Sequence, residues 1–268
     1  MTDTYQTTGA PLRLSGLRTV SLDDVVESAA LMRRVDRKYL VPAATADALI
    51  DALAHSHAAL QIAGRASTTY RSTYFDTPTF ASTRHHIQGR RRRWKIRSRW
   101  YVEDDLCRVE VKTKNGRGET IKVAGPSSPE RYGRLDGAEL AFVESVLAET
   151  HPELSPSDLV PSAEVTYTRA TLADLSAGTR VTIDWGVVAS LAVGSAWIDD
   201  DFVLIETKGR ALPARADRVL TSLGARPRSF SKYAAATSLL HDDIADNDIR
   251  DIRGRLLHCH SHSTQGLR

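Results

Sequence analysis

The sequence has few cysteines, few lysines and no long apolar run, and these shortages exclude several classes of protein. Two cysteines among 268 residues, Cys107 and Cys259, do not suggest a disulfide framework, and no spacing matches a zinc finger. No apolar stretch approaches the length of a membrane span, and the polar start of the chain lacks the apolar core of a signal peptide. These features are typical of a soluble protein, and we expect a cytoplasmic one without a membrane segment.

The short motifs of several common enzyme classes are also missing. The sequence contains no Gly-x-x-x-x-Gly-Lys-Ser/Thr loop, which argues against a P-loop enzyme. It contains neither a Gly-x-Ser-x-Gly elbow nor a His-Glu-x-x-His helix. Any enzyme activity must therefore use a different set of residues.

The overall charge is close to balanced, so an excess of basic residues can only be local. The chain has 36 basic and 33 acidic residues, for a net charge of +3. This balance does not favour nucleic acid as a partner, and the sequence leaves the oligomeric state open. Lysine is scarce beside arginine, and most lysines lie in strand-like segments. The lysines are Lys38, Lys95, Lys112, Lys114, Lys122, Lys208 and Lys232.

The most informative segment is the basic run Arg90–Tyr101, which has the period of a β-strand. Side chains alternate between the two faces of a strand, so this segment presents a basic face and an apolar face. The basic face carries Arg91, Arg93, Lys95, Arg97 and Arg99, and the other carries Trp94, Ile96, Ser98 and Trp100. Like charges repel one another at this density. The basic face therefore needs an anion, a set of carboxylates or open water.

The same combination of cations and one carboxylate recurs in other strand-like segments. These are Arg37–Pro42 with the preceding Asp36, Arg108–Lys114, Arg180–Trp185 and Leu204–Lys208. Each alone is typical of a half-buried strand whose charges lie in water. Their recurrence favours a second interpretation, in which the strands close into a barrel with the charges inside. Such a tunnel could bind a polyanion, and its carboxylates could hold a divalent metal.

The order of the predicted elements indicates the fold class. Helices are expected near residues 21–34, 43–55, 80–88, 135–148, 213–223 and 230–241. The strands cluster in hairpin-like runs, which favours an antiparallel α+β fold. We predict an eight-stranded antiparallel barrel with flanking helices over residues 17–241. Residues 1–16 are predicted to be disordered and residues 242–268 to form a flexible polar tail.

An ordered series of short motifs resembles the VTC domain, a branch of the triphosphate tunnel metalloenzymes. The motifs run from about residue 33 to residue 240, which is nearly all of the expected folded region. They are Arg37–Pro42, Tyr74–Thr77, Lys95–Tyr101, Glu110–Lys114, Tyr167–Arg169, Arg180–Asp184, Ile205–Lys208 and Phe230–Tyr233. Each motif is short, but the ordered set is specific.

The resemblance implies a polyphosphate polymerase, which transfers the γ-phosphate of ATP onto a phosphate or polyphosphate chain with Mn²⁺ or Mg²⁺. It implies that phosphates are contacted by Lys38, Arg97, Arg99, Lys112, Arg169, Arg180 and Lys232. Lys114, Lys208 and Ser231 fall in the same motifs, and Glu206 and Glu110 are the implied metal ligands. Two alternatives stay open: a hydrolase of a triphosphate compound, and a module that binds a polyanion without turnover.

The chain departs from the wider superfamily at its first motif. That superfamily opens with Glu-x-Glu-x-Lys, whereas Arg34–Lys38 keeps only an acid at Asp36 and a base at Lys38. The departure argues against the two-glutamate metal site of the triphosphatases and cyclases, and it favours the VTC branch.

Three further groups of residues have interpretations that do not involve the tunnel. His85 and His86 are expected to be a surface pair, since two-histidine sites without a third ligand are uncommon. A His-rich group near the C-terminus could bind a soft metal, although it falls in the predicted tail. That group is His258, Cys259, His260 and His262. The four tryptophans, Trp94, Trp100, Trp185 and Trp197, are expected to pack outside the barrel.

Overall fold

The computed structural model describes residues 12–29, 35–117 and 119–262. These residues form two compact units. Unit 1 takes its residues from 1–68, 167–187 and 198–229, and unit 2 takes its residues from 69–166, 188–197 and 230–268. Because both units are assembled from separate stretches of chain, each brings together motifs that lie far apart in the sequence.

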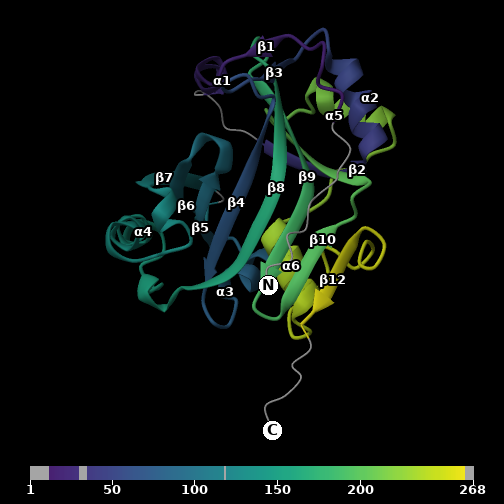
Figure 1. The fold of residues 1–268 in the computed structure, drawn as a ribbon. Coiled ribbons are helices and arrows are strands. Elements are labelled where there is room, and N and C mark those ends of the chain that lie inside the picture. The colour runs from purple at the N-terminus through teal and green to yellow at the C-terminus, as the bar shows by residue number, and fades with distance from the viewer. Residues whose placement is uncertain (1–11, 30–34, 118, 263–268) are drawn as a thin grey trace. The chain divides into compact units, whose positions relative to one another are not determined.

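The described residues contain twelve strands and six α-helices (Figure 1). The strands are β1 (Thr19–Val20), β2 (Val35–Pro42), β3 (Ala58–Leu60), β4 (Ser67–Asp76), β5 (Arg93–Tyr101), β6 (Leu106–Lys114), β7 (Thr120–Ser127), β8 (Val160–Asp174), β9 (Thr179–Leu191), β10 (Gly194–Ile198), β11 (Phe202–Gly209) and β12 (Leu257–Ser261). The α-helices are α1 (Leu22–Ala29), α2 (Ala43–Leu53), α3 (Ala81–Ile87), α4 (Gly137–Thr150), α5 (Arg215–Ser222) and α6 (Lys232–Leu240). All six expected helices are confirmed; the last part of the first prediction, residues 30–34, lies outside the described residues.

The strands form an antiparallel sheet, which confirms the α+β class. In unit 1, β11 pairs with β2 on one side and β9 on the other, and β8 continues toward β3 and the parallel strand β1. In unit 2, β4, β5, β6 and β7 form a meander, and β9 continues through β10 to β12. The barrel prediction needs correction in its detail, because twelve strands are present and the pairing of the described residues does not close the sheet. The unpredicted strands β1, β3 and β12 are short segments that lack a clear alternating pattern.

The core of unit 1 lies between its strands and the helices α2 and α5, which run side by side in Figure 1. Leu49, Ile50 and Leu53 of α2 are fully buried and pack in one cluster with Ile183 and Ile205. These two isoleucines are direct partners across β9 and β11. Because side chains alternate between the two faces of a strand, the charged residues of β9 and β11 lie on the face opposite these isoleucines.

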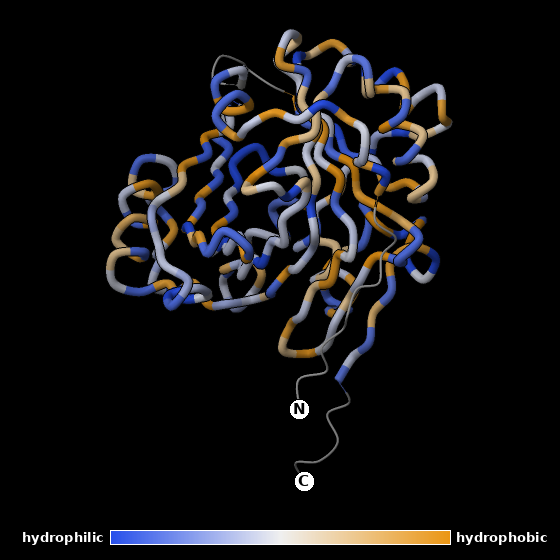
Figure 2. Tube along the Cα trace, turned by 45° about the horizontal axis from the view of Figure 1, so that its top comes forward, coloured by the Kyte–Doolittle hydropathy of each residue, from blue (hydrophilic) through white to orange (hydrophobic). Residues whose placement is uncertain are grey.

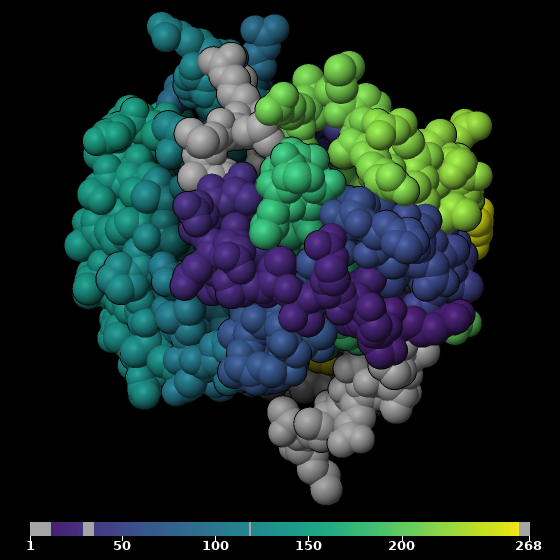
Figure 3. Space-filling view, turned by 90° about the horizontal axis from the view of Figure 1, so that it is seen from above, coloured from purple at the N-terminus to yellow at the C-terminus, as the bar shows by residue number. Residues whose placement is uncertain are grey.

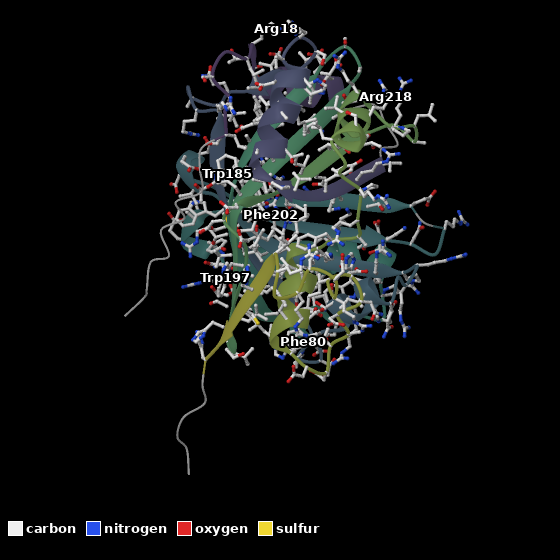
Figure 4. The ribbon with its side chains drawn as sticks, turned by 90° about the vertical axis from the view of Figure 1, so that its right-hand side faces the viewer. Arg18, Phe80, Trp185, Trp197, Phe202 and Arg218 are labelled. Atoms are coloured by element: carbon white, nitrogen blue, oxygen red, sulfur yellow. The ribbon has the colours of Figure 1, made fainter. Side chains whose placement is uncertain are left out.

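Unit 1 also includes residues that were expected to be disordered. Leu12 is buried in the core cluster, and the backbone of Arg13 donates a hydrogen bond to Asp47 of α2. Figure 3 shows the residues that follow, in purple, against the blue residues of α2. Trp185, which is labelled with Phe202 in Figure 4, packs against the same cluster, as expected for an outward-facing tryptophan.

The core of unit 2 lies between the β5–β7 meander and helix α4. Trp94 and Ile96 of β5 are buried with Val109 and Val111 of β6, against Val143 and other residues of α4. The apolar face predicted for the basic strand is therefore confirmed. Figure 2 shows hydrophilic and hydrophobic residues alternating along the strands. Across the described part of the chain, no helix has both the length and the apolar character needed to cross a bilayer.

Candidate functional site

In unit 1, Glu206 lies between two lysines on the charged face of the sheet. Its partner across the strands is Lys38 of β2 on one side and Thr182 of β9 on the other. The Lys38 Nζ is 3.4 Å from Oε1 of Glu206, and the Lys208 Nζ is 2.6 Å from Oε2. The Glu206 side chain is only 16% exposed. Each carboxylate oxygen thus faces its own ammonium group.

This enclosure changes the titration of both partners. Burial acts to raise the pKa of Glu206, but the positive charges of Lys208, Lys38 and Arg169 outweigh it and hold the pKa well below its usual range. Burial lowers the pKa of Lys208 to about 8, although the charge of Glu206 opposes that shift. Glu206 is therefore an anion at neutral pH, while Lys208 can lose its proton just above neutral pH.

Arg169 and Arg180 extend the charged face of unit 1. Arg169 makes a bidentate ion pair with the buried Asp184, with 2.5 Å from Nε to Oδ1 and 2.8 Å from Nη2 to Oδ2. The guanidinium also lies over the ring of Tyr167, 5.2 Å from its centroid. Arg180 of β9 is the direct partner of Lys208. Unit 1 therefore brings together five predicted site residues: Lys38, Arg169, Arg180, Glu206 and Lys208.

In unit 2, the charged face of the β5–β7 meander is almost entirely cationic. The register places Lys95, Lys112 and Lys122 directly opposite one another in a row across the three strands. Neighbouring rows pair Arg93 with Lys114, Arg97 with Glu110, and Arg99 with Arg108. Directly opposed like charges destabilise a sheet. Eight cations on this face of the three strands thus have one carboxylate among them: Arg93, Lys95, Arg97, Arg99, Arg108, Lys112, Lys114 and Lys122, with Glu110.

Glu110 acts as the counter-ion of this face. Its Oε2 accepts hydrogen bonds from Nε of Arg97, at 2.7 Å, and from Nη2 of the same side chain. Arg99 lies 3.7 Å from Oε2, and the Nζ of Lys122 lies 2.9 Å from Oε1. Burial would raise the pKa of Glu110, but Arg97, Arg99 and Lys122 hold it well below its usual range. Both oxygens therefore already contact cations.

The start of helix α6 adds polar groups to unit 2. Ser231 caps the helix, and its Oγ accepts a hydrogen bond from the Nζ of Lys95 at 2.8 Å. Lys232 is the first residue of α6, and its charge acts on Tyr74. Burial would raise the pKa of Tyr74, but Arg97, Arg99 and Lys232 lower it. The predicted residues Ser231 and Lys232 thus lie close to the cationic face of β5.

Sequence reasoning left three residues of unit 2 out of the predicted site. Lys95 was placed on the basic face without a role, Lys122 was noted only as a lysine, and Tyr74 only as part of a motif. Tyr74 accepts a hydrogen bond from Nη1 of Arg97 at 2.9 Å. The turn after Lys114 could have revealed Lys122, because a hairpin register there places it opposite Lys112. Nothing in the sequence alone indicates that Tyr74 contacts Arg97.

Glu110 and Glu206, the predicted metal ligands, do not by themselves make a complete site for a divalent metal. Within residues 12–29, 35–117 and 119–262, no group of three or more His, Cys, Asp or Glu side chains is arranged to hold a metal ion. Glu110 has the surroundings of a counter-ion. Glu206 also contacts cations, but Mg²⁺-like ions use one or two carboxylates together with substrate phosphates. Glu206 therefore fits an ion that arrives bound to phosphate oxygens, and not a site made by the protein alone.

Comparisons with known proteins place these features in context. The family described as VTC domain matches residues 33–241. A comparison with curated proteins found no match. Among solved structures, the chain is similar to a "putative adenylate cyclase" from Bacillus halodurans, with 16% identity, a TM-score of 0.47, and coverage of 75% of this chain and 96% of that one. It is also similar to a "putative adenylyl cyclase" from Hippeastrum, whose description gives a dominant triphosphatase activity, with 17% identity, a TM-score of 0.47, and coverage of 76% and 95%.

Proposed function

The chain belongs to the VTC domain family, and from this premise we propose that it is a phosphotransferase that moves the γ-phosphate of ATP onto a phosphate or polyphosphate chain. The proposed substrates are a nucleoside triphosphate, carried with Mn²⁺ or Mg²⁺, and polyphosphate. The proposed contacts are the predicted set: Lys38, Arg97, Arg99, Lys112, Arg169, Arg180 and Lys232, with Lys114, Lys208 and Ser231.

The cationic face of the β5–β7 meander carries this proposal. Eight cations with one carboxylate are a costly arrangement unless an anion neutralises them. On β5 alone the cations occupy four alternate positions from Arg93 to Arg99, a span of roughly 20 Å. That span is longer than three linked phosphates, which supports a polymeric phosphate rather than a triphosphate alone.

The chemistry needs little covalent help from the protein. Phosphoryl transfer depends on alignment and on stabilisation of negative charge. Arg97, Arg99 and Arg180 can each direct two donors at phosphate oxygens, and lysines supply point charges. A phosphate acceptor is already ionised, so the site needs no strong general base.

Glu206 has a separate role in the proposal. A divalent ion bound there together with phosphates would draw negative charge toward the leaving diphosphate. Glu206 supplies one oxygen, held in place by Lys38 and Lys208. A carboxylate on an anion-binding face is unfavourable unless a cation accompanies it. Lys38 and Lys208 meet that need in the free chain, so turnover is what distinguishes an enzyme from a binding module. Glu110, the second predicted metal ligand, has a side chain that is 4% exposed against 16% for Glu206, and we propose it as the counter-ion of the cationic face instead.

The test is incubation of the chain with ATP and Mn²⁺, followed by separation of nucleotides and phosphate polymers. We expect ADP together with phosphate chains. Free phosphate without chains would replace the proposal with a hydrolase, and tight polyphosphate binding without turnover would replace it with a binding module. Arg250→Ala is a matched control and should leave turnover unchanged, because the exposed Arg250 pairs with its neighbours Asp246 and Asn247, away from the proposed contacts in the sequence.

A further inference from the structure

The histidines near the C-terminus lie on an ordered strand. His258 and His260 belong to β12, and His262 follows it directly. The strand lies against β10, and the backbone N–H of His262 donates to the carbonyl of Val193 at 2.9 Å. The backbones approach so closely that a Cβ at Gly194 would lie 2.3 Å from the carbonyl oxygen of His260. The histidine row is therefore held by main-chain contacts within unit 2.

The alternation of the strand separates the histidines from the cysteine. Cys259 points to the other face of β12, where its Sγ lies 3.7 Å from the carbonyl oxygen of Leu239 in α6. The three histidines share the opposite face. The thiol is therefore not part of the histidine row, which the sequence pattern could not show.

The rings in the row have different neighbours. His258 packs on Trp197, with ring centroids 5.8 Å apart. His260 and His262 face each other in an edge arrangement, with centroids 6.4 Å apart. With metal–nitrogen distances of about 2.1 Å, two imidazoles that share one ion have centroids roughly 5–6 Å apart. The separation of 6.4 Å between His260 and His262 is slightly above that range, and both side chains are exposed.

Although two-histidine sites are uncommon, the closeness of these two exposed rings leads us to propose that His260 and His262 form one for a late first-row divalent ion. Neutral imidazole suits Zn²⁺, Ni²⁺ and Cu²⁺, and affinity at such a site rises to a maximum at Cu²⁺. Water completes the coordination, since neither a third histidine nor the thiol of Cys259 is in position. The site uses none of the residues of the proposed phosphotransferase, so the failure of either proposal leaves the other unaffected.

The experiment is a calorimetric titration of the full-length chain with Cu²⁺. The chain must lack a polyhistidine tag, and the buffer must not chelate. We expect one ion per chain, with affinity decreasing from Cu²⁺ to Ni²⁺ to Zn²⁺, and electron paramagnetic resonance of the copper form should show two imidazole nitrogens. Acidification to about pH 5 should release the ion, because protons compete for imidazole.

The variants assign the ligands. His260→Ala and His262→Ala should each weaken Cu²⁺ binding by about tenfold or more, because the second ligand binds as part of a chelate. His258→Ala and the control H85A/H86A should change it by less than about threefold. All these side chains are at least partly exposed, so unchanged thermal unfolding would show that the fold is kept. Wild-type affinity in the double variant H260A/H262A, an equal loss in His258→Ala, or several weak ions spread over the chain would overturn the assignment.

Discussion

Tyr74 stacks on Tyr233, with ring centroids 4.8 Å apart and an angle of 5° between the ring planes. The hydroxyl of Tyr233 donates to Oδ2 of the buried Asp76 at 2.8 Å, and Tyr74 accepts from Arg97. A chain of contacts thus runs from Asp76 through the two rings to a guanidinium on the cationic face. Because Tyr233 follows Lys232 in α6, the same contacts hold the start of that helix.

Asp76 should be one of the most important residues for the stability of unit 2. Its carboxylate accepts from the backbone N–H groups of Thr77, Ser82 and Thr83 as well as from Tyr233. Asp76→Ala leaves these donors without an acceptor, and each buried one costs about 1–3 kcal/mol. We expect a loss of at least about 3 kcal/mol in the free energy of unfolding, measured by urea titration.

Two other variants calibrate that loss. Tyr233→Phe keeps the stacked ring and removes one of four hydrogen bonds, so it should cost about 1 kcal/mol. Asp243→Ala removes an exposed ion pair with Arg84 and should cost about 0–1 kcal/mol. If Asp76→Ala is as mild as Asp243→Ala, the buried carboxylate does not organise this region.

The strands and helices were largely predictable because their patterns are local. The alternation of Arg90–Tyr101 identified β5 and its apolar face, and the turn after Lys114 identified the hairpin to β7. Strands β1 and β3 are two and three residues long, too short for a period to appear. Strand β12 is polar along most of its length, and it is held by backbone contacts with β10 that no side-chain pattern encodes.

The candidate site was predictable as a set of residues but not as a set of contacts. Composition and spacing placed Lys38, Glu206 and Lys208 on strand faces, and the structure then places both lysines beside the carboxylate. Sequence reasoning gave Glu110 the same role as Glu206. In the structure both carboxylates contact basic side chains, Glu110 through Arg97 and Lys122 and Glu206 through Lys38 and Lys208, and the sequence shows neither set of contacts.

Glu110→Gln should lower the stability of the chain and increase the stabilisation that a bound anion gives it. The change leaves three cations without their counter-ion, which costs roughly 3 kcal/mol for a buried group. Tripolyphosphate should then raise the thermal unfolding midpoint by more in the variant than in the wild type, because the ligand replaces the missing charge. Glu110→Asp, which keeps the charge, is the control. Weaker Mn²⁺ binding without a loss of stability would instead mark Glu110 as a metal ligand.

Glu206→Gln should separate turnover from binding. If Glu206 holds a metal ion at the reacting phosphates, its loss should lower the rate with ATP and Mn²⁺ by about 100–1,000-fold. Binding of tripolyphosphate without metal should be unchanged or tighter, because a negative charge has been removed. Turnover within about threefold of the wild type would exclude a catalytic role for Glu206, whichever product forms.

Lys208 should make anion binding sensitive to pH just above neutrality. Its pKa is lowered to about 8, so the free chain loses this positive charge as the pH rises from about 7 to 9. The dissociation constant for tripolyphosphate should increase over that range. Lys208→Gln should bind more weakly at pH 7 and lack this step, whereas Lys208→Arg should stay charged throughout.

Stability should respond in the opposite direction, which distinguishes lost charge from unfolding. The folded pKa of Lys208 lies below the ordinary lysine pKa of 10.5, so the protonated group opposes folding below about pH 8. That penalty is relieved as the pH rises from about 8 toward 10.5, because the unfolded chain then binds more protons than the folded one. The wild type should thus gain stability relative to Lys208→Gln over this range while its anion binding weakens. A parallel loss of binding and stability in the wild type, absent from the variant, would contradict the assigned role of Lys208.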